Sequence, residues 1–111
     1  MSLTVNLFDP TAKYYEEPLY DANITHNLAR MAGVAALYTV LWRPDNYSLS
    51  TARDLEPYLA AGVLKLKANQ ELCLQYSPKN GWGTYEDLLK FVESYLAACK
   101  EYPDAIVKVY R

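Results

Sequence analysis

Polar side chains gather around the single histidine of this protein, in the stretch NITHN at residues 23–27. Asn23, Thr25, His26 and Asn27 lie immediately before an apolar pattern of helical period. Thr25 or Asn23 suits the cap of that helix, and the free N–H groups of a first helical turn attract anions. We therefore expect this stretch to bind a phosphate, a carboxylate or a polar ring. The alternative is a capped helix in which His26 has a structural role.

A second polar helix start occurs in the sequence NGWGTYED at residues 80–87. The glycines on either side of Trp82 permit a tight loop, so the indole is held while the backbone approaches a neighbour closely. Thr84 is a natural N-cap, with Asp87 as its capping-box partner. We expect Trp82 to stack on a planar ligand beside Thr84 and Tyr85. The alternative is that Trp82 anchors the loop to the core.

Arg43, in the sequence LWRP, adds a fork-shaped donor that suits phosphate or carboxylate groups. It would serve equally well in a surface ion pair with Asp45 or Glu56. A ligand site built from all these stretches requires that the regions around His26 and Trp82 fold to line one hollow. The predicted ligand-binding residues are Asn23, Thr25, His26, Asn27, Arg43, Trp82, Thr84 and Tyr85.

Catalysis has less support in the sequence than binding. His26 would serve as a general base, but the sequence has no G-x-S-x-G, H-E-x-x-H or phosphate-binding Walker motif. A metal site needs several ligands beyond one histidine and scattered carboxylates. We therefore expect no cofactor and no metal, and a small histidine-dependent enzyme is the third hypothesis after the two binding roles below.

Length and charge limit the class of protein. The 111 residues suit one domain, residues 1–111, with a single core. The net charge is −2 and the basic residues are dispersed, so nucleic-acid binding is not expected. No apolar run reaches the length of a membrane span, and the N-terminus does not resemble a signal peptide. Cys73 and Cys99 form no zinc or redox motif, which favours reduced thiols in a cytoplasmic setting.

Periodicity predicts the elements that must position these residues. Residues 3–9 and 104–111 alternate as half-buried strands, whereas residues 11–20, which include Pro18, have no clean period. A helical pattern begins at Thr25, and Gly33 is expected to divide it into two shorter helices. Thr51 and Asp54 form a capping-box pair, but Pro57 either kinks that helix or moves its start to about residue 56.

Two further helices complete the prediction. Residues 70–76 favour a short helix, and the residues after Thr84 have the clearest amphipathic pattern of the sequence. A pair of strands is marginally stable alone, so both must pack on the helices. We therefore predict an α+β fold: a mostly helical single domain with the N- and C-terminal strands paired in a small sheet.

Three motifs also resemble a known group of proteins. The segments YDANITHNL at residues 20–28, LWRP at residues 41–44 and NGWGTYE at residues 80–86 are similar to motifs shared by small uncharacterised proteins of phages and mobile elements. The resemblance extends over residues 20–105. It implies a context rather than an activity: such proteins often bind a host protein or sequester a nucleotide-type signal in an anti-defence role.

The leading hypothesis is a non-enzymatic protein that binds a small polar or nucleotide-like ligand. The second is a protein-interaction module that inhibits a host protein through a tyrosine-rich surface, because the sequence has 11 tyrosines. An exposed patch of Tyr14, Tyr15, Tyr20 and Tyr47 would favour the second hypothesis. A homo-oligomeric state stays open under both.

Overall fold

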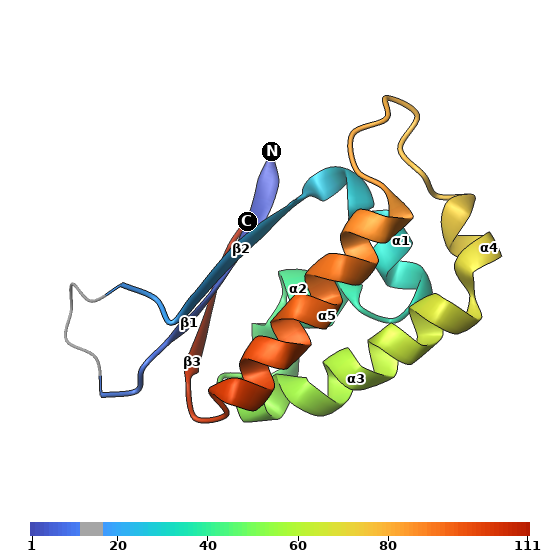
Figure 1. Ribbon diagram of the computed structural model, residues 1–111. Coiled ribbons are helices and arrows are strands. Elements are labelled where there is room, and N and C mark those ends of the chain that lie inside the picture. Colours follow the sequence, from blue (N-terminus) through green and yellow to red (C-terminus); the bar gives the residue numbers. More distant parts are fainter. Residues whose placement is uncertain (12–16) are drawn as a thin grey trace.

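A computed structural model describes residues 1–11 and 17–111 of the protein (Figure 1). A small antiparallel sheet packs against a layer of helices, so the fold is α+β as predicted. The elements in sequence order are β1 (Ser2–Phe8), β2 (Tyr20–Thr25), η1 (His26–Leu28), α1 (Ala29–Val34), α2 (Tyr38–Trp42), η2 (Pro44–Tyr47), α3 (Ala52–Ala68), α4 (Gln70–Leu74), α5 (Tyr85–Glu101) and β3 (Ile106–Tyr110).

The sheet has the strand order β2-β1-β3, with both neighbours antiparallel to β1. Val5 lies opposite Ala22 on one side and opposite Val109 on the other. The predicted pairing of the N- and C-terminal strands is therefore confirmed. The strand β2 was not predicted, because its outward positions are polar and its sequence was interpreted as the approach to a helix.

The core lies between the sheet and the helices. Leu3, Val5 and Leu7 of β1 are fully buried, and Figure 1 shows the helices gathered on one side of the sheet. The two long helices α3 and α5 pack together and supply most of the facing side chains. Their apolar positions recur at helical spacing, so the stripe of α5 is buried against α3 and the sheet.

Both long helices begin at the predicted caps. The side chain of Thr51 accepts a hydrogen bond from the N–H of Asp54, and the carboxylate of Asp54 accepts one from the N–H of Thr51. Thr84 and Asp87 form the same reciprocal pair at α5. Because α3 starts at Ala52, Pro57 lies inside the helix, and a start near residue 56 is wrong. The stabilisation of the helix start by the capping box is larger than the cost of the backbone hydrogen bond that Pro57 cannot donate.

The region after Thr25 forms two short helices, as expected, but the break differs in position. Gly33 lies inside α1, and the backbone turns instead at Ala36, whose φ is 57°. The N–H of Leu37 bonds to the C=O of Ala32, which closes the end of α1. Leu37 then packs on Gly62 of α3, where an added Cβ would clash with the Leu37 side chain.

Candidate functional site

A groove of about 410 Å³ lies between the edge strand β2 and the helix α5, with the loop before α5 at one end. Its floor is apolar and its rim carries hydroxyl, amide and charged groups. The lining residues are Tyr20, Ala22, Asn23, Ile24, Thr25, Leu28, Trp82, Gly83, Asp87, Lys90, Phe91 and Ser94.

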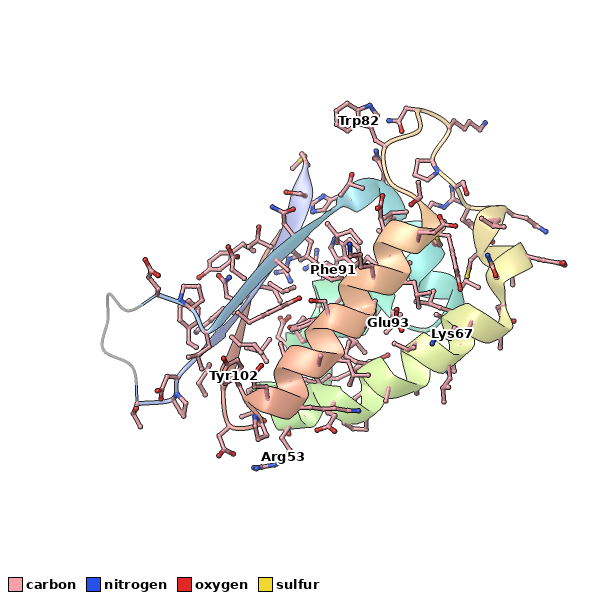
Figure 2. The ribbon with its side chains drawn as sticks, in the orientation of Figure 1. Arg53, Lys67, Trp82, Phe91, Glu93 and Tyr102 are labelled. Carbon is pink, nitrogen blue, oxygen red and sulfur yellow. The ribbon has the colours of Figure 1, made fainter. Side chains whose placement is uncertain are left out.

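One flank of α5 forms the helical wall of this groove. Asp87, Lys90, Phe91 and Ser94 follow the spacing i, i+3, i+4, i+7, so their side chains share one face of the helix. Phe91 is largely buried, whereas the other three are exposed. Figure 2 shows Phe91 on the part of α5 that lies beside the sheet. This wall therefore presents an aromatic base below a polar rim.

Tyr20 closes the groove at the end away from the loop. Its hydroxyl lies 2.8 Å from the hydroxyl of Ser94, and its ring stacks on Tyr95 with the centroids 5.9 Å apart. Burial raises the pKa of the Tyr20 phenol, an effect that the hydrogen bond to Ser94 only partly offsets. Tyr20 therefore stays neutral and joins β2 to α5 through both stacking and hydrogen bonding.

At the other end, a loop holds Trp82 against the end of β2. The N–H of Trp82 bonds to Oδ1 of Asn80 at 3.0 Å, and Nδ2 of Asn27 donates to the C=O of Trp82 at 3.4 Å. Gly83 has a φ of 101°, and an added Cβ would lie 2.7 Å from Cγ2 of Thr25. The indole itself is 71 % exposed and projects from the molecule (Figure 2). The backbone of this loop is thus anchored while its indole faces solvent.

His26 faces a different hollow, of about 630 Å³. This hollow lies between η1 and the segment after α4, and its lining residues are His26, Asn27, Arg30, Gln75, Tyr76, Ser77, Pro78, Lys79 and Asn80. The imidazole lies edge-on to the ring of Trp42 with the centroids 6.1 Å apart. Its Nε2 is buried and makes no hydrogen bond within the described residues. Arg30 lies over the ring of Tyr76, 5.7 Å from its centroid.

The rings of His26 and Trp82 therefore do not line one common hollow. Asn27 and Asn80 border both the His26 hollow and a third hollow of about 540 Å³ that includes Trp82. The side chain of Asn27 bonds to the backbone carbonyl oxygen of Trp82 and so joins the two motifs. The two motifs are adjacent, but the rings of His26 and Trp82 line different hollows.

The remaining predicted site residues lie elsewhere. Arg43 is exposed at the end of α2, and it lines none of the hollows described above. Thr84 uses its hydroxyl in the cap of α5. Tyr85 is buried, and its hydroxyl donates to the C=O of Leu66 at 2.8 Å. Burial also raises the pKa of the Tyr85 phenol. Asn23, Thr25 and Trp82 are the predicted residues that meet at the groove.

Sequence reasoning missed the helical wall of the groove. Lys90, Phe91 and Ser94 were treated as part of an ordinary amphipathic helix, although their flank differs from the buried stripe. The signal that could have shown the strand was the alternation of Tyr20, Ala22 and Ile24. The position of this strand beside α5 is a long-range contact that no local pattern indicates.

Of the four tyrosines whose exposure as a patch would favour an interaction surface, the structure describes Tyr20 and Tyr47. Tyr20 is half-buried at the groove, while Tyr47 is 52 % exposed and stacks on Tyr58 with the centroids 6.0 Å apart. Tyr14 and Tyr15 lie outside the described residues.

Cys73 and Cys99 are free thiols, and both are buried. Across residues 1–11 and 17–111, no group of three or more His, Cys, Asp or Glu side chains is arranged to hold a metal ion. None of the helices within the same ranges combines the length and apolar content needed to cross a bilayer.

Comparisons of this sequence and fold with protein-family models, with curated proteins and with solved structures gave no match. The functional assignment therefore rests on the geometry of the protein itself.

Proposed function

We propose that this protein is a non-catalytic binding protein, whose partner is a segment of another protein held in the groove between β2 and α5. The observation that carries this proposal is the environment of Trp82. Its backbone is fixed by hydrogen bonds to Asn80 and Asn27, yet its indole is 71 % exposed at the rim of the groove.

An indole in this position favours recognition over packing. A tryptophan that serves only as an anchor buries its ring, because its large apolar surface gains free energy on leaving water. Tryptophans are also enriched among the residues that contribute most to protein–protein affinity, and they lie where the partner covers them. Trp42 meets the expectation for an anchor, since it is 3 % exposed.

The groove next to Trp82 suits a protein segment better than the predicted nucleotide-like ligand. Its wall contains one cation, Lys90, and one carboxylate, Asp87, which already accepts the N–H of Thr84. A phosphate group would need several converging donors. The apolar floor formed by Phe91, Ile24 and Ala22 favours a side chain instead.

The resemblance to mobile-element proteins supports a host protein as the partner and an inhibitory, anti-defence role as the consequence. The two buried free thiols support a reducing, cytoplasmic setting.

A display library of random linear peptides tests the proposal, with the immobilised protein as bait. Selected peptides should bind the native protein and lose about tenfold or more in affinity to Trp82→Ala, as expected for an aromatic residue at an interface centre. The control is Tyr58→Ala, which removes a comparable exposed ring on α3, away from the groove. Selection of no peptide, or of peptides that bind both variants equally, would overturn the proposal.

A small polar ligand in the His26 hollow is the second candidate. The observation that favours it is the unpartnered, buried Nε2 of His26 beside a lining that includes Arg30, Gln75 and Asn80. Native mass spectrometry of the purified protein, with and without cell extract, tests it. A retained small molecule that is lost in His26→Ala and kept in Trp82→Ala supports this candidate, and an unmodified protein mass in extract contradicts it.

A further inference from the structure

The strand β2 lies at the edge of the sheet, so half of its backbone groups face away from β1. The N–H of His26 bonds to the C=O of Met1, in continuation of the ladder in which Ser2 pairs with Thr25. Bonded and non-bonded pairs alternate along antiparallel strands. The backbone groups that bond to β1 are therefore those of Tyr20, Ala22 and Ile24, and the groups that point outward are those of Asp21, Asn23 and Thr25.

A contact at the far end of the ladder agrees with this alternation. The C=O of Leu7, which lies opposite Tyr20 in the register, accepts the N–H of Leu19 at 2.7 Å and so points toward β2. The C=O of Thr25 begins the first turn of η1. In the described part of the protein, the N–H and C=O groups of Asp21 and Asn23 and the N–H of Thr25 make no further hydrogen bond.

The start of the opposite edge of the sheet is covered by the protein itself. The N–H of Val107 in β3 bonds to the C=O of Ser50 at 2.9 Å, and the C=O of Ala105 accepts the N–H of Ala52 at 2.9 Å. Thr51 forms an isolated bridge to Ile106 between these two bonds. The segment before α3 therefore covers the start of the β3 edge, and the fold leaves the β2 edge open.

The open edge of β2 forms one wall of the groove. Ala22, Asn23, Ile24 and Thr25 all line it, although the side chains of consecutive strand residues point to opposite faces. Because all four residues line the groove, the feature that they share there is the unpaired backbone edge of β2. The facing wall of α5, from Asp87 to Ser94, is about 10 Å long, which suits about three residues of extended backbone.

We propose that the partner segment binds by adding to β2 as a further antiparallel strand, between β2 and α5. This inference rests on the proposed function and specifies how the groove performs it. Backbone hydrogen bonds to Asp21, Asn23 and Thr25 supply affinity, and alternate side chains of the segment enter the groove. The antiparallel direction continues the pairing of the existing sheet and starts the segment beside Trp82.

The chemistry of the groove specifies the segment. Phe91, Ile24 and Ala22 present an apolar floor that suits an aliphatic side chain. Lys90 has an exposed ammonium group, and among the described residues no carboxylate lies within ion-pair distance of it. A carboxylate of the segment complements this charge. The partner therefore carries an aliphatic residue within two positions of an acidic one.

A second copy of this protein fits the groove less well than a foreign segment. Its own β2 would approach with Ile24 and Tyr20, whose side chains are already packed against the core of that copy. The free side chains of its edge are Asp21, Asn23 and Thr25, and none of them is aliphatic. The apolar floor over Phe91 would remain unfilled.

The test uses a peptide selected by display on the native protein, synthesised with a single N-methyl group at each amide in turn. Methylation should weaken binding by about tenfold at alternate amides, which would otherwise bond to β2, and by less than about threefold at the amides between them. This series leaves the protein unchanged. A selected peptide that binds through Trp82 but shows no alternation would overturn strand addition while leaving the proposed function intact.

A matched pair of variants tests the same edge from the protein side. Asn23→Pro removes an outward N–H and no bond to β1, and it should lower affinity about tenfold. Asn23→Thr keeps the N–H and should bind within about threefold of the native protein. Equal affinity for the two variants would contradict strand addition. Lys90→Glu should change the selected residue from acidic to basic, whereas Lys100→Glu, with the same charge change further along α5, should not.

Discussion

The side-chain amide of Asn27 donates a hydrogen bond to the backbone carbonyl oxygen of Trp82 at 3.4 Å, across 55 positions of sequence. This contact joins the two motifs that stood out in the sequence. It places the loop before α5 at the end of β2, so that the exposed indole lies at the mouth of the groove. The motif around His26 therefore holds the backbone of the loop that carries Trp82.

Gly83 should be the residue of this loop that is least tolerant of a side chain. Its positive φ and the proximity of Thr25 both oppose a Cβ, so Gly83→Ala is expected to cost about 1–3 kcal/mol of unfolding free energy. Urea denaturation measures this cost. Gly33→Ala is the matched control, since its Cβ would meet open space inside α1, and it should stabilise the protein by about 0.5–1 kcal/mol. Equal effects of the two variants would contradict the loop geometry.

Trp82→Ala should leave stability almost unchanged, within about 0.5 kcal/mol, because the indole is exposed. In a Trp42→Phe background, the remaining fluorescence should report a solvent-exposed indole that shifts to the blue when a selected peptide binds. A free-state spectrum typical of a buried indole would show that Trp82 is an anchor of the core.

Tyr95 and Tyr85 form a matched test of buried hydroxyl groups. The Tyr95 hydroxyl is buried and has no hydrogen-bond partner within the described residues, whereas that of Tyr85 donates to the C=O of Leu66. Tyr95→Phe should therefore be neutral or stabilise the fold by up to about 1 kcal/mol, and Tyr85→Phe should destabilise it by about 1–2 kcal/mol. Chemical denaturation of both variants provides the comparison, and the reverse order would refute these assignments.

Stability should decline at alkaline pH. Burial raises the pKa of the Cys99 thiol from 9.0 to about 12, and burial also raises the pKa of the Tyr95 phenol. Between pH 9 and pH 12 the unfolded protein loses the Cys99 proton while the folded protein keeps it. The stability that the buried Cys99 thiol contributes is therefore complete below pH 9 and is lost as the pH rises toward 12. Unfolding free energies measured across this window should fall with pH. In Cys99→Ala, the slope should lessen by about 1.4 kcal/mol per pH unit; an unchanged slope would contradict the shift.

Much of the fold could be predicted from local sequence signals. The Thr51–Asp54 and Thr84–Asp87 boxes mark the starts of α3 and α5 because each pair satisfies its own backbone groups without help from distant segments. The alternation in β1 and β3 marks each segment as a strand locally, whereas their pairing was predicted as the simplest arrangement of two strands that must pack on the helices. Pro57 misled the prediction, since the cost of a missing donor depends on the stability of the whole helix.

The candidate site was less predictable, because it depends on contacts between distant segments. Thr25 caps η1 as predicted, because its hydroxyl accepts a hydrogen bond from the N–H of Asn27. The position of Asn23 and Thr25 on a strand whose edge is open was not predicted. Trp82 was singled out for the glycines on either side of it. The contribution of Lys90 and Phe91 to the same groove could be identified only once α5 was placed beside β2. Tyr85 was selected for its position near a cap, and its burial follows from the stripe of α5.

Amide hydrogen exchange of β2, measured with and without a selected peptide, tests the central claim most directly. In the free protein, the N–H groups of Ala22 and Ile24 should exchange slowly, and those of Asp21, Asn23 and Thr25 should exchange rapidly. With the peptide bound, we predict strong new protection of Asn23 and its alternate neighbours, and little change in β3. Unaltered exchange at Asn23 in a saturated complex would contradict recognition through the open edge of the sheet.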